Sequence, residues 1–380
     1  MNKEIDISVV LPTLNEEKTI STCIEKIKKV FKEQKLNGEI IVSDSSTDKT
    51  PIIAKQKGAK VVYPKKKGYG RAYIEGFKHA KGKIIVMGDA DNTYDFLEIP
   101  KLIKPIQEGK ADFVFGSRLR GEIKKGAMPW HHKYIGNPVL TFIFNKVFNT
   151  NISDTHSGFR AFTKKAYNKL ELRTTGMEFA SELFIEAVRK GLRIAEVPIT
   201  YYPRRGEPSK LSSFGDGWRH LRFMLLYRPT KFLLFPGISS FLLALLTYFL
   251  FYIRSTGSNN FAFHSLIFGS LFLIIGVQFM LTGVNLKIYS VIIGNSEKNG
   301  FIKKVMDYHS LEKEILLSIL LIFAGFLLGF KVIYVWARTG FNQLSQIGTA
   351  ILSFTFISLG FQILFSSIFV SLFMLKNGEN

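Results

Sequence analysis

The sequence has a single cysteine, Cys23, in 380 residues. One thiol cannot form a disulfide within the chain, so the small disulfide-stapled secreted proteins are excluded, and a reducing compartment fits better. Zinc sites built from Cys and His are also disfavoured. His131, His132 and His156 have no cysteine at the spacing that zinc motifs require, and we expect no zinc.

Acidic residues are scarce relative to basic ones. The chain has 30 Asp and Glu against 51 Lys and Arg, a formal net charge of +21 at pH 7. Such an excess fits contact with nucleic acid, with an anionic membrane surface or with anionic substrates. The sequence has no aromatic stacking platform and no known nucleic-acid-binding module. We therefore expect no nucleic-acid partner and assign the charge to membrane and substrate.

Charge is almost absent from four long stretches near the C-terminal end. They cover about 232–253, 261–286, 315–336 and 347–375, and Lys331 is the only Lys, Arg, Asp or Glu within them. Each reaches the roughly 20 residues that a helix needs to cross a bilayer. A buried helix of a soluble protein would explain one such run, but four in succession predict a membrane domain over 231–380 with four transmembrane helices.

Two features predict the orientation in the membrane. Met1–Glu17 has acidic residues and a strand-like run instead of a basic start and an apolar core, so we expect no signal peptide. An even number of spans places both ends on one side. The connection between the second and third spans is rich in lysine, which by the positive-inside rule lies in the cytoplasm. We therefore expect a multi-pass protein of the cell membrane whose N-terminal domain and both termini are cytoplasmic.

Strand-like and helical patterns alternate along the N-terminal domain, residues 1–211, regularly up to Asp95 and less regularly after it. The apolar run Asp6–Thr13 precedes a segment in which apolar residues recur on one helix face, and the same alternation continues to Met87. This order predicts an α/β domain with a parallel sheet covered on both faces. Residues 212–230 mix apolar and basic side chains and predict an interfacial helix leading into the first span.

Two carboxylates follow the strand that ends near Met87. Asp89 and Asp91 are two residues apart, so in extended backbone both side chains point the same way, at the strand end where such folds bind ligands. Their mutual repulsion is relieved by a divalent cation, which prefers oxygen ligands and also binds phosphates. We expect Asp89 and Asp91 to hold Mg²⁺ or Mn²⁺. Asp95 is expected to be a structural or helix-start residue.

The pair resembles the DxD motif of nucleotide-sugar glycosyltransferases with the GT-A (Rossmann-like) fold. Three further segments occur in the order found in family 2 of these enzymes: VVLPTLNEE (Val9–Glu17), VSDSSTDKT (Val42–Thr50) and KKGYGRA (Lys66–Ala72). The resemblance implies nucleotide-binding residues at Pro12, Thr13, Glu16, Asp44, Gly68, Gly70 and Asp89. Ser43 stands where the family has its first Asp, so the base contact would rest on Asp44.

Other segments resemble the polyprenyl-phosphate sugar synthases, that is the dolichyl-phosphate mannose and glucose synthases. They include GDADNTYDF, FGSRLRG, PWHHKYIGNP, SDTHSGFRAF, GMEFASEL and YYPRRGEPSKL, and the likeness extends from Asp6 to about Arg228. The resemblance implies a GDP- or UDP-sugar donor and a membrane polyprenyl (dolichyl) phosphate acceptor. It implies contacts to the acceptor phosphate from Arg118, Lys133, Arg204, Arg205 and Lys210. Lys133 stands where arginine is usual, so a bidentate contact would become a point charge.

The implied reaction needs little acid–base chemistry. A phosphate monoester carries about 1.5–2 negative charges near neutral pH and is already a nucleophile. It requires cations that hold it beside the donor carbon, and a metal that neutralises the leaving diphosphate. We therefore expect Asp89, Asp91, Arg118, Lys133 and Arg204 to form the catalytic set. Direct displacement would invert the anomeric configuration of the transferred hexose.

The donor is predicted less sharply than the reaction. Thr93 occupies the place of Gln in the DxDxQ pattern of dolichyl-phosphate mannose synthases, which weakens the case for GDP-mannose. The segments MGDADNTYDF and GMEFASEL more closely resemble the dolichyl-phosphate glucose synthases. The resemblance therefore favours UDP-glucose, with UDP-N-acetylglucosamine next and GDP-mannose as the remaining alternative. A processive polysaccharide synthase would carry QxxRW before its membrane channel, and GWRHLRF does not match. A non-enzymatic lipid-carrier scaffold remains an alternative that the intact carboxylate pair disfavours. Asp154 and Ser157 resemble a family segment near the sugar or are turn caps.

Overall fold

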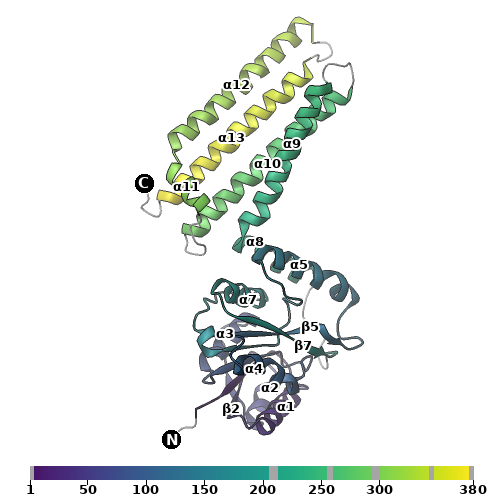
Figure 1. Cartoon of the computed structure of the whole chain (residues 1–380), viewed down its shortest axis with the longest axis vertical. Helices are drawn as coiled ribbons and strands as arrows, with labels where there is room; N and C mark the ends of the chain where they lie inside the picture. Colours follow the sequence, from purple (N-terminus) through teal and green to yellow (C-terminus); the bar gives the residue numbers. More distant parts are fainter. Residues whose placement is uncertain (1–3, 205–212, 255–259, 293–299, 342–345, 376–380) are drawn as a thin grey trace. The chain divides into compact units, whose positions relative to one another are not determined.

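The computed structural model describes residues 4–204, 213–254, 260–292, 300–341 and 346–375 (Figure 1). The chain divides into two compact units, Met1–Met224 and Leu225–Asn380. We expected the first domain to end at residue 211. The division by contacts falls inside helix α8 (Ser213–Tyr227), within the predicted interfacial segment 212–230, and the predicted domain limits stay predictions.

The N-terminal unit is built on a seven-stranded sheet with the order β3-β2-β1-β4-β6-β5-β7. Its strands are β1 (Ile7–Thr13), β2 (Gly38–Asp44), β3 (Lys60–Val62), β4 (Ile84–Met87), β5 (Phe113–Ile123), β6 (Arg160–Thr163) and β7 (Ile194–Tyr201). The pairs β1–β2, β1–β4, β2–β3 and β5–β7 are parallel. Their carboxyl ends therefore bring the loops after β1, β2 and β4 to one edge.

The parallel pairing predicted from the strand–helix alternation up to Met87 is confirmed for β1, β2, β3 and β4, but the sequence did not predict the short antiparallel strand that follows. Strand β6 lies between β4 and β5 and runs antiparallel to both. It has only four residues, Arg160–Thr163, and the first three are buried. A segment this short has too few positions to show the alternation that identifies a strand. Its insertion matters for the site because it places residues 154–158 beside the loop after β4.

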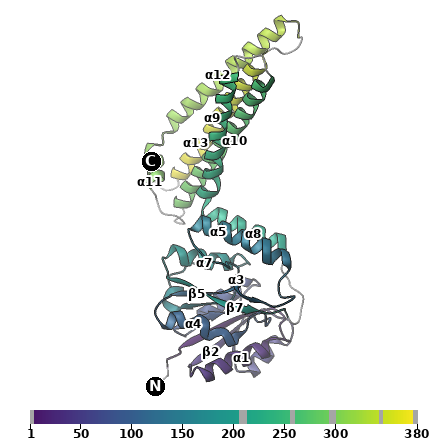
Figure 2. The same cartoon turned by 45° about the vertical axis from the view of Figure 1, so that its right-hand side comes forward.

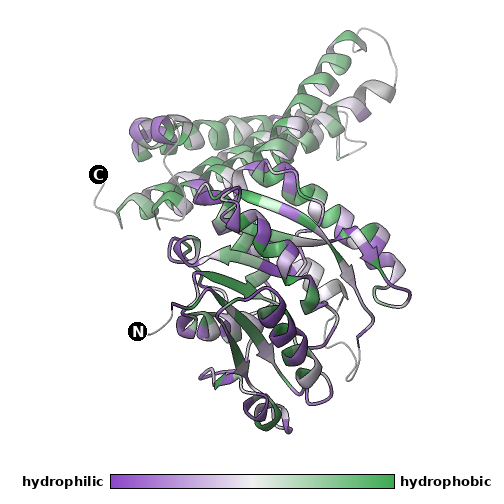
Figure 3. Ribbon diagram, turned by 60° about the horizontal axis from the view of Figure 1, so that its bottom comes forward, coloured by the Kyte–Doolittle hydropathy of each residue, from purple (hydrophilic) through white to green (hydrophobic). Residues whose placement is uncertain are grey.

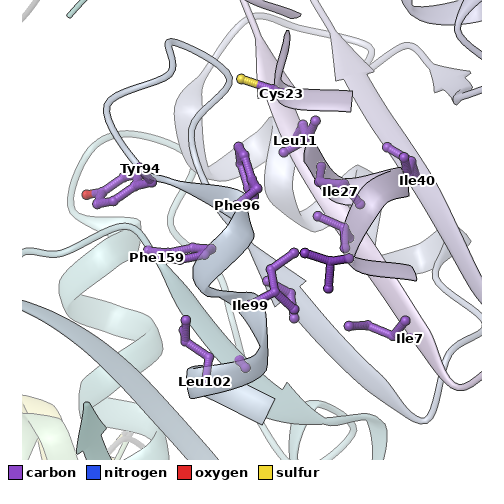
Figure 4. Close-up of a cluster of buried hydrophobic side chains, with 14 of the residues drawn as sticks. Ile7, Leu11, Cys23, Ile27, Ile40, Tyr94, Phe96, Ile99, Leu102 and Phe159 are labelled. Carbon is purple, nitrogen blue, oxygen red and sulfur yellow. The ribbon is translucent and has the colours of Figure 1, made fainter. Parts of the chain in front are cut away.

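Helices cover both faces of the sheet. On one face lie α1 (Ile20–Glu33), α2 (Thr50–Gln56) and α4 (Ile99–Gln107), which follows the short turn η1 (Phe96–Glu98). Figure 4 shows Ile27 of α1 and Ile99 and Leu102 of α4 near Ile7 and Leu11 of β1. Each of these side chains is at most 1% exposed. This dry core fixes β1 and β4, and with them the loops that carry the site.

Aromatic side chains fill the opposite face. Helices α3 (Tyr69–His79) and α7 (Phe179–Arg189) meet there, and the ring of Tyr73 stacks on Phe179 with centroids 5.7 Å apart. Helix α5 (Asn137–Phe148), which follows the π-helical turn η2 (His132–Gly136), packs Phe144 on Phe184 at 4.7 Å. The short helix α6 (Lys164–Tyr167) completes the unit, and both cartoon views show α7 close to α3 (Figure 2).

The C-terminal unit is helical. It contains α9 (Pro229–Arg254), α10 (Asn260–Ile292), α11 (Gly300–Tyr308), α12 (Leu311–Arg338) and α13 (Ile347–Leu375). Four helices are long and apolar enough to cross a membrane: Pro229–Ile253, His264–Ile292, Leu311–Arg338 and Ile347–Leu375. They agree with the four predicted spans to within a few residues, and hydrophobic colouring runs along them (Figure 3). Helix α9 packs along α10, α12 along α13, and α10 against α13.

Candidate active site

A cavity of about 670 Å³ lies at the carboxyl ends of β1 and β4 in the N-terminal unit. Among the residues that line it, those predicted from the sequence are Pro12, Thr13, Glu16, Gly68, Asp89, Asp91, Arg118 and Arg204. The structure thus brings the predicted nucleotide, metal and acceptor residues to one cavity. Three predicted residues are described but do not line it: Asp44, Gly70 and Lys133. Arg205 and Lys210 lie outside the described residues.

Asp89 is held by two tyrosines from one helix. Tyr69 and Tyr73, one turn apart on α3, donate their hydroxyls to Oδ1 at 3.1 and 3.2 Å. The other oxygen, Oδ2, faces Gly158, where an added Cβ would lie 2.9 Å away. Burial, together with the nearby charge of Asp91, raises the pKa of Asp89 to about 7 despite the tyrosine hydrogen bonds. A cation at this carboxylate would oppose both effects.

Asp91 is held by a neutral residue, Thr93, and by a cation, Arg204. Thr93 donates its backbone N–H at 3.1 Å and its hydroxyl at 2.6 Å to Oδ1. Arg204 places Nη1 3.1 Å from Oδ2, and its Nη2 lies 2.5 Å from Oε1 of Glu16. Thr93, the residue that departs from the DxDxQ pattern, therefore orients Asp91. Arg204 joins the predicted metal ligand to the predicted nucleotide residue.

The donor set fits a divalent cation shared with a substrate. Asp89 and Asp91 supply carboxylate oxygens in one cavity, the chemistry that Mg²⁺ and Mn²⁺ prefer. Within the described ranges, no group of three or more His, Cys, Asp or Glu side chains could hold a metal alone. A cation here would thus complete its coordination with water and phosphate oxygens, as Mg²⁺ commonly does.

Asp44 lies behind the cavity surface. It is 2% exposed, and its Oδ1 accepts hydrogen bonds from the hydroxyls of Thr13 at 2.7 Å and Ser46 at 2.6 Å. Asp44 thereby ties the loop after β1 to the loop after β2, and Ser45 lines the cavity next to it. Its predicted contact with the base stays a prediction.

The two glycines of the GYG segment differ in their surroundings. Gly68 lines the cavity with φ +156°, and a Cβ there would lie 2.5 Å from the carbonyl oxygen of Thr175. At Gly70 a Cβ would lie 2.6 Å from Cβ of Phe179 on α7. The small size of Gly70 therefore permits α3 to pack closely on α7, whereas Gly68 leaves its backbone at the cavity.

Arg118 is anchored by a buried carboxylate. Its Nε and Nη2 donate to Asp154 at 2.7 and 2.9 Å, and its backbone N–H donates to the same side chain at 3.1 Å. The guanidinium also lies over the ring of Tyr201, 5.1 Å from its centroid. The charge of Arg118 and its hydrogen bonds hold the pKa of Asp154 below its usual value against the opposing effect of burial. Asp154 is thus the counter-ion of Arg118, a role that the sequence did not reveal.

Lys133 and Asp95 are placed away from this charge cluster. The Lys133 ammonium lies 5.2 Å from the ring centroid of Tyr134, while its neighbour His132 lines the cavity. Asp95 is the N-cap of η1, where it accepts a hydrogen bond from the backbone of Leu97 at 3.2 Å. The expectation that Asp95 is a helix-start residue is confirmed.

Several residues of the site were missed from the sequence. Tyr69 and Tyr73 are four residues apart on the helix after the glycine segment, so their spacing predicts that they share a face. The sequence does not show that this face meets Asp89. Glu182 accepts from the backbone of Arg173 and Thr174, which holds the loop beside Gly68 and Gly70. His156 and His220 both line the cavity. They are too far apart in the sequence for any local pattern to pair them.

Comparison with known proteins agrees with these features. Residues 8–171 match the family described as glycosyl transferase family 2, and residues 284–374 match the glycosyltransferase family 2 C-terminal transmembrane region. The expected fold class, an α/β GT-A domain followed by membrane-spanning helices, is therefore confirmed, and so is the class of enzyme.

Three relatives are named for their activities. A hexosyltransferase of low-salt glycan biosynthesis from Haloferax volcanii is 40% identical over 362 residues, 95% of this chain and 87% of the relative. A dolichyl-phosphate hexose transferase from the same organism is 33% identical over 56% of this chain and 89% of its own length. A dolichol-phosphate mannosyltransferase from Pyrococcus furiosus is 33% identical over 54% of this chain and 59% of its own length. By the likeness that extends over nearly its whole length, the chain belongs to glycosyl transferase family 2.

Proposed function

We propose that this protein transfers a single hexose from a nucleotide sugar to a polyprenyl (dolichyl) phosphate in the membrane, with inversion and with a divalent metal. The observation that carries the proposal is that one cavity is lined by the carboxylates of Asp89 and Asp91 and by the guanidinium groups of Arg118 and Arg204. A cation site and an anion site side by side fit a donor diphosphate and an acceptor phosphate that react with each other.

The bond changes are those of a displacement at the anomeric carbon. An oxygen of the acceptor phosphate forms a bond to C1 of the hexose, and the bond from C1 to the donor diphosphate breaks. The electron pair leaves with the nucleoside diphosphate, whose charge the metal at Asp89 and Asp91 would neutralise. No proton has to be removed from the attacking phosphate, in agreement with the lack of a predicted general base.

The basic residues hold the acceptor. Arg118 is fixed by Asp154 and by the ring of Tyr201, so its remaining guanidinium donors are preorganised in the cavity. Arg204 adds a second guanidinium. Lys133, Arg205 and Lys210 remain proposed contributors, and Lys133 would have to turn away from the ring of Tyr134 to reach the phosphate.

A UDP-sugar is the favoured donor, with glucose first and N-acetylglucosamine next. Thr93 in place of Gln supports this choice, since its side chain bonds Asp91 and adds no amide to the site. GDP-mannose is the second candidate, and the likeness to a dolichol-phosphate mannosyltransferase favours it. We further propose that the catalytic domain and both termini are cytoplasmic, because the connection between the second and third spans is rich in lysine.

A transfer assay tests the function. The full chain in detergent is incubated with a polyprenyl phosphate and UDP-glucose, UDP-N-acetylglucosamine or GDP-mannose, with Mn²⁺ or EDTA, and the lipid product is weighed by mass spectrometry. We expect one hexose adduct that requires metal. Asp91→Asn should reduce turnover at least about 100-fold, whereas Asp95→Asn, the matched change at the helix cap, should stay within about threefold.

Three results would count against the proposal. A folded protein that forms no adduct with any donor would favour a different acceptor or the non-enzymatic scaffold. Equal activity of Asp91→Asn and the unaltered protein would exclude the proposed metal site. A product that carries several hexoses would indicate a processive enzyme instead.

A further inference from the structure

Two histidines that line the cavity belong to a short chain of polar side chains. His156, in the loop before β6, and His220, on α8, contact each other edge to face with ring centroids 4.5 Å apart. His220 Nδ1 lies 2.7 Å from the hydroxyl of Ser181 on α7. His156 Nδ1 lies 2.8 Å from the hydroxyl of Thr155. Both rings are therefore oriented by neighbours on their Nδ1 side.

The second ring nitrogen of His156 has no such neighbour. Its Nε2 is buried and has no hydrogen-bond partner among the described residues, although the side chain lines the cavity. Leaving a buried polar atom without a partner costs free energy, and such atoms often await a ligand. Burial, with the nearby His220, lowers the pKa of His156 well below its usual value, so the ring is neutral near pH 7. A neutral ring is suited to a hydroxyl group more than to a phosphate.

The place of His156 along its loop locates that ligand. Asp154, two residues earlier, binds Arg118, the proposed acceptor-phosphate residue. Gly158, two residues later, faces Oδ2 of Asp89, the proposed metal ligand. A hexose that is attached to a metal-bound diphosphate and is about to react with an acceptor phosphate must lie between these two groups. His156 occupies the intermediate position of the loop.

We propose that His156 binds a hydroxyl of the donor hexose through Nε2, and that Thr155 and His220 position its ring. This inference rests on the proposed function for the identity of the bound sugar. It makes His156 a residue that distinguishes among hexoses. The carboxylates and guanidinium groups, in contrast, contact the phosphates common to all donors.

Binding measurements isolate the contribution of the hexose to the affinity for the nucleotide sugar. Calorimetry with the full chain in detergent and Mn²⁺ compares UDP-glucose with UDP, and GDP-mannose with GDP, for the unaltered protein and for His156→Ala. We expect the variant to bind the preferred nucleotide sugar about tenfold more weakly, the effect of losing one hydrogen bond in a site shielded from water. Binding of the bare nucleotide should not change. His131→Ala, an exposed histidine outside the cavity, is the matched control and should match the unaltered protein.

Two further reagents keep the test independent of folding. His156→Gln places an amide near the position of Nε2 and should recover part of the lost affinity. Donor analogues that lack one hydroxyl each should reveal the contact, because the analogue without the bound hydroxyl should bind the unaltered protein and His156→Ala equally. Equal weakening of nucleotide and nucleotide sugar, an unchanged affinity, or the same loss with every analogue would overturn the proposal.

The two proposals fail separately. If no lipid product forms but His156→Ala selectively weakens the nucleotide sugar, the acceptor assignment is wrong and the hexose contact stands. If transfer to the lipid occurs but His156→Ala leaves the difference between sugar and nucleotide unchanged, the function stands and the contact is wrong.

Discussion

The ion pair between Arg118 and Asp154 has a close structural twin on the surface of the same domain. Arg193 and Asp112 also form a fork, with Nε and Nη2 each 2.9 Å from a carboxylate oxygen, and the backbone N–H of Arg193 donates at 3.1 Å. The two pairs differ mainly in exposure. The side chains of the inner pair are 9% and 0% exposed, against 58% and 28% for Arg193 and Asp112. Comparison of the two pairs therefore isolates the effect of burial on the stability that an Arg–Asp pair of this geometry contributes.

Asp154→Asn should destabilise the domain strongly. The substitution removes the charge that compensates a buried guanidinium and turns an amide N–H₂ toward the donors of Arg118. Breaking a buried pair on one side costs about 3 kcal/mol or more of unfolding free energy. A domain of this size changes its melting temperature by about 2–4 °C per kcal/mol, so the melting temperature should fall by roughly 6–12 °C. Asp112→Asn should lower it by at most about 2 °C, because water replaces the lost contact.

The assay is thermal unfolding of the full chain in one detergent at one scan rate, followed by intrinsic fluorescence. Since the pKa of Asp154 is lowered in the folded state, its ionised form stabilises the fold above the unfolded-state pKa of about 3.9, and this contribution is lost as pH falls further. The difference in melting temperature between the unaltered protein and Asp154→Asn should thus be largest at pH 7 and become smaller below about pH 4. Equal shifts for the two variants at pH 7 would refute the reasoning.

Three other predictions concern the carboxylate site. Tyr73→Phe removes one of the two hydroxyl donors to Asp89 and should weaken Mn²⁺ binding about tenfold in a titration followed by electron paramagnetic resonance. Gly158→Ala should abolish transfer in a protein that still folds, because its Cβ would lie 2.9 Å from a carboxylate oxygen, whereas Gly300→Ala meets no atom within 4 Å and should be silent. Arg204→Gln should bind Mn²⁺ more tightly without substrate, since a competing cation is gone, yet it should transfer hexose more slowly. A fall in both the Mn²⁺ affinity and the transfer rate would contradict this prediction.

The sequence was informative where a property repeats along the chain. The four spans were found to within a few residues because apolar composition over some twenty positions is a long signal. The carboxylate pair was found because it directly follows a buried strand. Strand β6 was missed because its four residues are too few to show a period. Its omission also hid the antiparallel pairing that brings the loop 154–158 to the site.

Contacts between distant segments were beyond local patterns. Asp154 and Arg118 are 36 residues apart, and Ser181 and His220 are 39 apart. The first bond depends on the completed sheet, and the second depends on the packing of α8 against α7. The motif around Asp154 could be recognised, but a sugar contact and a turn cap were equally compatible with it. Only the folded chain shows the carboxylate paired with Arg118.

The charges of the site fit the proposed divalent metal. Asp89, Asp91 and Glu16 bring three carboxylates to the cavity that we propose to receive a diphosphate and a phosphate. Arg204 lies against two of them, so in this arrangement its guanidinium is engaged by the protein's own acids. A divalent cation at Asp91 would displace that guanidinium and free it for a phosphate oxygen. Metal binding and acceptor binding would then be coupled through one side chain, whereas Arg118, fixed by Asp154, keeps its place throughout.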